Sequence, residues 1–302
     1  MVKPPGSEPR RSRRTGPTPL TLRDRPLVIA HRGASQALPE HTLGAYRRAL
    51  EHGADGLECD VRLTSDGHLV CVHDRRVERT SNGRGPVSTL ALHQLEALDW
   101  ATWRNPWRDL DEDALDDDPQ ASFVTLERLL DLVKDWGRPV DLVIETKHPT
   151  RYAGLVERSL VELLHRYGWA RTRRGVRSPV RVMSFSWISL RRCLEMAPGL
   201  EMVYLMERVP LRYRDGTLPL GASIAGPSME IVRAHPEYVE AAHAAGHEVH
   251  VWVANAATDI ELCAATGVDA VITDDPEGAL RQLTARATRL GSGELPTRLE
   301  ET

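Results

Sequence analysis

Three acidic residues lie in short apolar segments, where carboxylates are unusual. Glu58 and Asp60 are two residues apart in GLECDV, so in a strand both side chains project from one face. Glu145 ends the segment DLVIE. If the two strands are neighbours, like charges converge and need a cation, a proton or basic partners. Carboxylates suit Mg2+, Ca2+ or Mn2+ better than Zn2+, so we expect one divalent cation on these three residues. An interior salt-bridge network with Arg32 or Lys147 is the alternative.

Two histidines also end predicted strands. His31 closes LVIAH and precedes Arg32, while His73 closes LVCVH and precedes Asp74. A pair of histidines beside carboxylates is typical of general acid–base catalysis, because imidazole titrates near neutral pH. Arg32 and Lys147 add positive charge, the first as a bidentate phosphate ligand and the second as a point charge. Together these residues indicate phosphoester chemistry.

The elements that must position these residues alternate between strands and helices, which predicts βα units and a parallel sheet. Only TSDGH separates the second and third strand candidates, too few residues for a parallel crossover, and its Asp-Gly pair indicates a hairpin. The other eight strands predict an α/β fold, a TIM (β/α)8 barrel with a small β-hairpin/loop insertion after the second strand. The expected strands are 27–30, 56–63, 69–73, 141–146, 180–185, 201–205, 223–225, 249–253 and 270–273. The expected helices include 39–51, 125–134, 236–245 and 260–265.

Composition excludes several classes of protein. The 302 residues carry a net charge of -4 without a basic footprint, which argues against nucleic acid as a partner. No apolar run approaches 18 residues, and the first 25 residues contain no signal-peptide core, so we expect a cytoplasmic protein without a transmembrane segment. The four cysteines show no CxxC spacing.

The domain prediction has three parts. Residues 1–25 are expected to form a basic disordered tail, 26–283 the barrel domain and 284–302 a flexible C-terminal tail. The acidic run 109–118 is expected to be a solvated loop. The segment 100–107 contains three tryptophans and is the one segment whose sequence suggests peripheral membrane contact, although packing on the barrel is favoured. The sequence does not indicate an oligomeric state.

An ordered set of motifs resembles the glycerophosphodiester phosphodiesterase family over about residues 26–283. These motifs are HRGAS at 31–35, PEHT at 39–42, ECDV at 58–61, TSDG at 64–67, HD at 73–74, ETK at 145–147, SF at 184–185, VWVAN at 251–255 and ITDDP at 272–276. HRG alone is weak, but the whole ordered set is specific. The usual second motif is Pro-Glu-Asn-Thr, so His41 replaces an asparagine, a change expected to affect only a loop hydrogen bond.

The resemblance implies a metal-dependent enzyme that hydrolyses glycerophosphodiesters to glycerol 3-phosphate and an alcohol, in lipid and glycerol metabolism. It implies that His31 and His73 exchange protons and that the three carboxylates hold the cation. Arg32 and Lys147 would hold the phosphate of a small-molecule substrate, and Glu40 would support the first loop. Trp252 matches an aromatic that lines the pocket, with packing inside the barrel as the alternative.

Two other interpretations compete with this one. Lysophospholipase D-like, sphingomyelinase D-like and phosphatidylinositol phospholipase C-like enzymes share the barrel and the histidine pair, but act on lipids and need an apolar rim. A non-catalytic barrel that binds phosphodiesters or a protein partner is the second alternative. It is disfavoured because every motif position carries a chemically competent residue.

Overall fold

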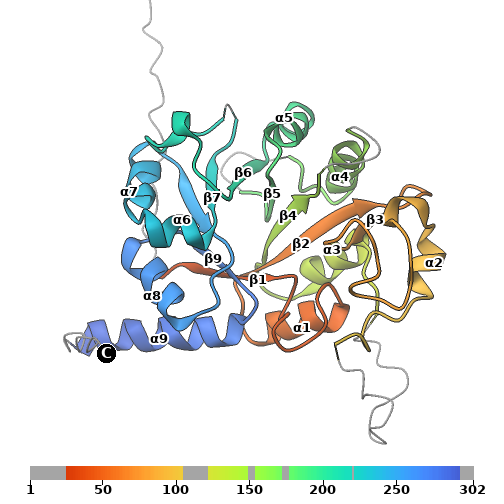
Figure 1. Cartoon of the computed structure of the whole chain (residues 1–302), viewed down its shortest axis with the longest axis horizontal. Coiled ribbons are helices and arrows are strands. Elements are labelled where there is room, and N and C mark those ends of the chain that lie inside the picture. The colour runs from red at the N-terminus through yellow and green to blue at the C-terminus, as the bar shows by residue number, and fades with distance from the viewer. Residues whose placement is uncertain (1–24, 105–121, 149–153, 172–176, 220, 293–302) are drawn as a thin grey trace, which may run out of the picture.

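Eight parallel strands form a closed barrel in the computed structural model, which describes residues 25–104, 122–148, 154–171, 177–219 and 221–292 (Figure 1). The strand order is β1-β9-β8-β7-β6-β5-β4-β2, and pairing of β1 with β2 closes the barrel. The predicted TIM barrel is confirmed. Its strands are β1 (Leu27–His31), β2 (Gly56–Leu63), β4 (Asp141–Thr146), β5 (Val180–Ser184), β6 (Glu201–Met206), β7 (Ile224–Pro227), β8 (Glu248–Val251) and β9 (Ala270–Thr273).

Alternation along each strand separates two apolar layers. In β2, Leu57, Cys59 and Val61 belong to the large core cluster that packs the strands against the helices. A second cluster, which includes Ile29 and Val143, fills the interior of the barrel. Because successive side chains of a strand point to opposite faces, the residues between the outward ones must enter the interior. This alternation carries the acidic residues of β2 and β4 inside the barrel.

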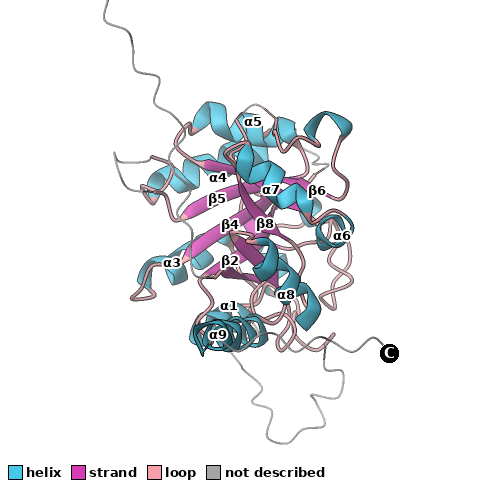
Figure 2. Ribbon diagram, turned by 90° about the vertical axis from the view of Figure 1, so that its left-hand side faces the viewer, coloured by secondary structure: helices cyan, strands magenta, loops and turns pink. Residues whose placement is uncertain are grey.

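Helices surround the strands (Figure 2). The predicted helix at 39–51 begins only at Leu43, because Thr42 is its N-cap and accepts a 3.2 Å hydrogen bond from the backbone of Ala45. The helices are α1 (Leu43–Glu51), α2 (Leu92–Glu96), α3 (Leu126–Asp135), α4 (Leu155–Arg166), α5 (Trp187–Met196), α6 (Met229–Ala234), α7 (Glu237–Ala244), α8 (Ala257–Thr266) and α9 (Pro276–Ser292).

The insertion after β2 starts with the predicted hairpin. Strand β3 (Leu69–Cys71) pairs antiparallel with β2, and the turn closes with a 2.9 Å bond from Thr64 N to His68 O. Beyond β3 the insertion adds a 3-10 turn, η1 (Val87–Thr89), and α2, neither of which the sequence predicts. A separate apolar cluster holds these pieces together, and it contains Val70, Val72, Val77, Val87, Leu95, Trp100 and Phe123.

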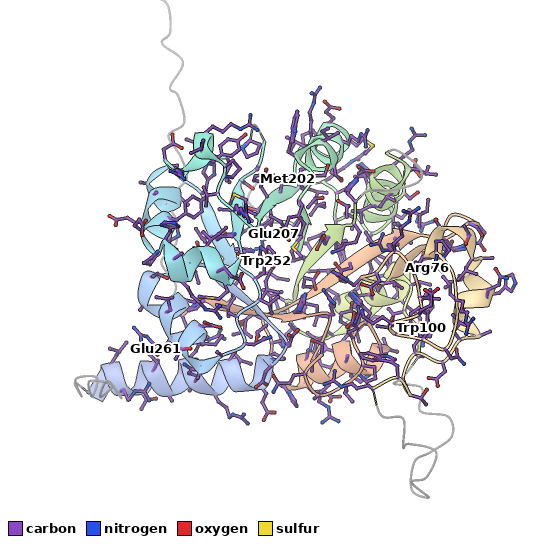
Figure 3. The ribbon with its side chains drawn as sticks, viewed as in Figure 1. Arg76, Trp100, Met202, Glu207, Trp252 and Glu261 are labelled. Atoms are coloured by element: carbon purple, nitrogen blue, oxygen red, sulfur yellow. The ribbon has the colours of Figure 1, made fainter. Side chains whose placement is uncertain are left out.

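The insertion buries part of the tryptophan-rich segment. Trp100 is buried, its ring lies 4.8 Å from that of Phe123, and its Nε1 donates to Leu95 O (Figure 3). Packing is therefore confirmed for Trp100, whereas Trp107 and the acidic run 109–118 lie outside the described residues. Within the described part of the chain, no helix is both long and apolar enough to cross a membrane.

Both domain ends extend slightly beyond the predicted boundaries. Arg25, placed in the N-terminal tail from the sequence, forms a 2.6 Å ion pair with Asp55. Helix α9 continues to Ser292, nine residues past the expected end at 283, and Arg286 pairs there with Glu261 of α8. The boundary expected at 283 thus falls inside helix α9. Residues 1–24 and 293–302 lie outside the described residues.

Candidate active site

Strand register places the predicted site residues side by side. His31 lies opposite Glu58 in the β1–β2 pair, and Asp60 lies opposite Glu145 in the β2–β4 pair. The three carboxylates are buried, and each offers an oxygen within 4.8 Å of those of the other two. Glu58 lies level with His31, the last residue of β1, and Glu145 is the last residue but one of β4. The cluster therefore lies at the carboxyl-terminal end of the barrel, where active sites of (β/α)8 barrels are found.

Two cationic side chains reach this carboxylate cluster. Lys147 Nζ lies 2.8 Å from Glu145 Oε1 and 3.2 Å from Asp60 Oδ1. Arg32 Nε lies 3.2 Å from Asp60 Oδ2, and the Arg32 backbone N–H donates a 3.0 Å hydrogen bond to Glu58 Oε2. The salt-bridge network that the sequence left as an alternative is thus present. The two cations pair with Asp60 and Glu145, whereas Glu58, among the residues described, accepts only from the Arg32 backbone, so the cluster is negative when all three carboxylates are ionised.

Burial makes the carboxylates unequal. Burial and the charge of Asp60 raise the pKa of Glu145 to about 8 and raise the pKa of Glu58 well above its ordinary value. Burial acts in the same direction on Asp60, but the hydrogen bond from His41 and the charge of Lys147 outweigh it. They hold the pKa of Asp60 well below its usual range. Glu58 and Glu145 therefore favour their protonated forms unless more positive charge arrives.

The donor set fits a divalent cation. Glu58 Oε1 is buried and has no hydrogen-bond partner among the described residues. Leaving a buried carboxylate oxygen unpartnered is costly, and a hard cation would satisfy it. We therefore assign Glu58, Asp60 and Glu145 as the residues that could hold such an ion.

The loop after β1 adopts an unusual backbone that aims Arg32 into the site. Arg32 has a φ of 57° and Gly33 a φ of 89°. A Cβ on Gly33 would lie 2.6 Å from the carbonyl carbon of Ala45, so only glycine fits this close approach. Arg32 Nη1 donates a 3.0 Å hydrogen bond to Glu40 Oε1, which places the guanidinium between Glu40 and Asp60.

His41 has a larger role than the sequence predicted. It is buried, its Nε2 lies 2.9 Å from Asp60 Oδ2, and its Nδ1 lies 2.6 Å from Tyr46 Oη. Burial lowers the pKa of His41. The neutral ring can donate from Nε2 to the ionised Asp60 and accept from the Tyr46 hydroxyl. The predicted loop hydrogen bond is thus a direct contact with a carboxylate of the cluster.

His31 is oriented by an aspartate from the last strand region. Its Nδ1 lies 2.7 Å from Asp274 Oδ1. Asn255 Nδ2 donates a 2.6 Å bond to Asp274 Oδ2, and Ser35 Oγ lies 2.8 Å from Asp274 Oδ1. Burial opposes ionisation of Asp274, but hydrogen bonding and charge at His31 outweigh it and hold the Asp274 pKa far below its usual range. The opposite ring nitrogen, Nε2, lies 4.0 Å from Glu58 Oε2.

His73 is held in the same way by a residue of the insertion. Its Nδ1 lies 2.6 Å from Asp74 Oδ1, and its backbone oxygen accepts bonds of 3.0 and 2.7 Å from Arg62. Burial lowers the pKa of His73 to about 4. Hydrogen bonds from Arg79 and His73 overcome the effect of burial and lower the pKa of Asp74 to about 2.

The two Asp–His pairs have the same chemical consequence. An ionised carboxylate only accepts hydrogen bonds, so each Nδ1 facing it must carry the proton. That tautomer leaves Nε2 of both His31 and His73 as the atom available for proton exchange with a substrate. The arrangement can therefore support acid–base chemistry beside a carboxylate cluster and two cationic groups.

Trp252 follows β8 and lies near the centre of the molecule (Figure 3). Its Nε1 donates a 2.7 Å bond to Gly226 O, and its ring meets Phe185 edge to face at 5.3 Å. It also packs against the interior cluster of the barrel. The packing interpretation is therefore confirmed, while contact of Trp252 with substrate stays a prediction.

The sequence that forms this site matches a known protein family. Residues 31–278 match the model of the Glycerophosphoryl diester phosphodiesterase family. The chain belongs to this family. The expected glycerophosphodiester phosphodiesterase is thereby confirmed at the level of the family.

Known relatives agree with this assignment. The "Probable glycerophosphodiester phosphodiesterase 1" of Mycobacterium tuberculosis is 46% identical over 255 residues, which covers 84% of this chain and 91% of the relative. A glycerophosphodiester phosphodiesterase of Caldanaerobacter subterraneus is 34% identical, covering 83% and 95%. A phosphodiesterase structure from Oleispira antarctica shares the fold, with a TM-score of 0.72 at 23% identity over 86% of this chain and 97% of that one.

Sequence reasoning missed the roles of the residues that orient the histidines. Asp74 and Asp274 both lie in motifs used for the family resemblance, HD and ITDDP, but neither was assigned a function. The available signal was their position, because each is an acidic residue that follows a strand at the active-site end. Arg79, which contacts Glu40 and Asp74, carried no sequence signal.

Proposed function

We propose that this protein hydrolyses glycerophosphodiesters to glycerol 3-phosphate and an alcohol with the help of a divalent cation. The observation that carries the proposal is the pair of Asp–His units, Asp274–His31 and Asp74–His73, at the end of the barrel that holds the carboxylate cluster. A phosphodiester needs negative charge neutralised, a nucleophile deprotonated and a leaving alcohol protonated. The site has residues suited to each task.

In this proposal Arg32 and Lys147 bind the phosphate oxygens. Arg32 is preset by Glu40 and Asp60, while Lys147 lies between Asp60 and Glu145. A divalent cation bound to Glu58, Asp60 and Glu145 would neutralise charge that develops on the phosphate. That cation would also compete with Lys147 for the carboxylates, which frees the ammonium group to meet the substrate.

The proposed proton transfers use Nε2 of the two histidines. One ring takes a proton from the glycerol 2-hydroxyl or from water, and the other protonates the departing alcohol. If the hydroxyl attacks, a cyclic phosphate forms, and water opens it with the two roles reversed. Asp74 and Asp274 hold each ring in one tautomer and stabilise its charged form.

Exposed apolar side chains lie beside Trp252 at the start of α5. Phe185, Trp187 and Ile188 are 41%, 42% and 49% exposed just after β5, and Phe185 contacts Trp252. An apolar rim of this kind favours a second candidate substrate, a lysophospholipid whose acyl chain lies on it. The lipid-directed alternative therefore remains, with this rim in place of the buried Trp100.

The test is product release from defined substrates. Purified protein would receive glycerophosphocholine, glycerophosphoethanolamine or lysophosphatidylcholine with Mg2+, Ca2+ or Mn2+, and the same reactions would run with a chelator. Release of glycerol 3-phosphate that the chelator stops is the expected result, and the His73→Ala variant is the inactive control. Turnover of the lysolipid alone would favour the second candidate. No turnover despite demonstrated metal binding would contradict both and favour a binding protein.

Two broader expectations from the sequence also remain proposals. We propose a cytoplasmic location and a role in lipid and glycerol metabolism. Cell fractionation, and glycerophosphodiester levels in a strain that lacks the protein, would test them.

A further inference from the structure

Arg79 joins two parts of the site from outside the barrel. Its Nε donates a 2.6 Å hydrogen bond to Asp74 Oδ2. Its Nη1 and Nη2 donate to the two oxygens of Glu40, at 2.8 and 2.7 Å. One guanidinium therefore holds a carboxylate of the insertion and a carboxylate of the loop after β1.

Each of those carboxylates also contacts a residue that takes part in the proposed reaction. Asp74 uses its other oxygen, Oδ1, to hold His73 Nδ1 at 2.6 Å. Glu40 Oε1 accepts from both Arg79 and Arg32, and Arg32 Nη1 lies 3.0 Å away. A continuous series of charge-assisted hydrogen bonds thus connects His73 with Arg32, and Arg79 is its middle member.

The insertion anchors Arg79 at this point. Val77 belongs to the apolar cluster of the insertion, and Thr80 and Ser81 are buried. Thr80 N and Ser81 Oγ both donate to Val77 O, which makes a tight turn around Arg79. The backbone that carries the guanidinium is therefore fixed, although the side chain itself is 43% exposed.

We propose that Arg79 is a positioning residue that aligns His73, through Asp74, with the phosphate-binding Arg32, through Glu40. This inference rests on the proposed function, because it assigns a task to Arg79 within the same reaction. It also gives the insertion a purpose: it supplies the histidine, the carboxylate that orients it and the arginine that locks both to the barrel.

The planar arrangement of N–H donors explains why this position needs a guanidinium group. Three of its nitrogens are engaged at once, and the two-point contact with Glu40 fixes the angle of that carboxylate. A lysine would restore the charge but could not hold both carboxylates in a planar arrangement. We therefore expect Arg79→Lys to rescue only part of what Arg79→Gln loses.

A purely structural role predicts different behaviour. The backbone of His73 is held separately, by the two bonds from Arg62 to its carbonyl oxygen. Arg79 is partly exposed, so its removal leaves no cavity in the core. The fold and the location of His73 should survive the substitution, and the orientation of its ring should not.

Arg76 offers a matched control in the same loop (Figure 3). Its guanidinium donates to Glu78 at 3.1 and 2.6 Å and is 59% exposed. Arg76→Gln removes the same charge three residues away without breaking the bonds to Asp74 or Glu40. Any effect of net charge on an anionic substrate would appear in both variants.

The experiment measures kcat and KM for glycerophosphocholine in wild type, Arg79→Gln, Arg79→Lys and Arg76→Gln, with melting temperatures as a check on folding. We expect Arg79→Gln to lower kcat/KM by roughly 10- to 100-fold, as loss of an orienting contact commonly does. We expect kcat to fall, because His73 loses its orientation, and KM to rise, because Arg32 binds the phosphate less well. The kcat/KM of Arg79→Lys should lie between those of wild type and Arg79→Gln, and that of Arg76→Gln should match wild type.

Two further measurements separate positioning from general damage. In a double-mutant cycle, Arg79→Gln and Asp74→Asn should cost less together than the product of their separate effects on kcat. Nitrogen NMR of the His73 ring, which needs no substrate, should show the Nδ1–H tautomer in wild type and a mixture in Arg79→Gln.

Unchanged kinetics in Arg79→Gln would overturn the proposal, as would an equal loss in Arg76→Gln or fully multiplicative effects with Asp74→Asn. If wild type turns over no glycerophosphodiester, the proposed function fails. The NMR measurement still decides whether Arg79 sets the His73 tautomer, and an unchanged tautomer would refute that.

Discussion

Nδ1 of His31 lies 2.7 Å from Oδ1 of Asp274, although 243 residues separate them in the sequence. The pair forms because β1 and β9 are neighbours in the closed barrel, with Ala30 opposite Thr273. Closure of the barrel thus brings an acidic residue to the one ring nitrogen of His31 that faces away from the carboxylate cluster. The hydrogen bonding of the His31 ring thus depends on the residue that follows the last strand of the barrel.

Replacing Asp274 should therefore impair catalysis without unfolding the protein. Asp274→Asn can present its amide to His31 and favour the tautomer with the proton on Nε2. We expect kcat to fall by about 100-fold or more, since a wrong tautomer cannot accept a proton at the required nitrogen. Steady-state kinetics with glycerophosphocholine would measure this. Asp269→Asn is the matched control, because Asp269 forms an Asp–His pair with His243 just before the same strand.

The two histidines should be needed for turnover but not for metal binding. His31→Ala and His73→Ala each remove one site of proton transfer, and we expect turnover to fall by at least about 100-fold. Neither ring belongs to the carboxylate cluster, so affinity for Mn2+ measured by calorimetry should stay nearly unchanged. A large loss of affinity in one variant would mean that this histidine is a ligand.

Binding of a divalent cation should release a proton near neutral pH. Burial, then Asp60, raise the pKa of Glu145 to about 8, so this carboxyl is protonated at pH 7 and must ionise to become a ligand. Affinity should rise with pH through about 8, because Glu145 must ionise and the pKa of Glu58 is raised as well. Calorimetry in two buffers with different ionisation heats would count the protons released. Glu145→Gln should bind the cation more weakly and lose the part of the pH dependence that Glu145 contributes, whereas flat affinity from pH 6 to 8 in wild type would contradict this account.

His41 should tolerate asparagine but not leucine. His41 has a φ of 59°, a conformation that asparagine adopts readily, and an asparagine amide can still donate to Asp60. Leucine removes the donor, and a lost hydrogen bond to a charged group costs about 1.5–3 kcal/mol. We expect His41→Asn to keep most of the wild-type kcat/KM and cation affinity. In His41→Leu both kcat/KM and cation affinity should fall roughly 10-fold. Equal behaviour of the two variants would show that the contact with Asp60 is unimportant.

The barrel and the residues at its carboxyl-terminal end could be predicted from local sequence patterns. Alternation of apolar segments with helical patterns is local information, and so is the five-residue TSDGH link that requires a hairpin. Glu58 and Asp60 share a face because side chains alternate along any strand. These features depend on neighbours in the chain, so they could be predicted without a structure.

Contacts between side chains that are distant in the sequence could not be predicted in this way. Three hydrogen bonds show this: His41 to Asp60, His31 to Asp274, and Arg79 to Glu40. Each joins segments whose proximity in space is not encoded by any local sequence pattern. The extension of α9 to Ser292 likewise follows contact with α8, where Arg286 pairs with Glu261. Hydrogen bonds between distant residues need angstrom-level placement, and only the packed barrel with its insertion supplies it.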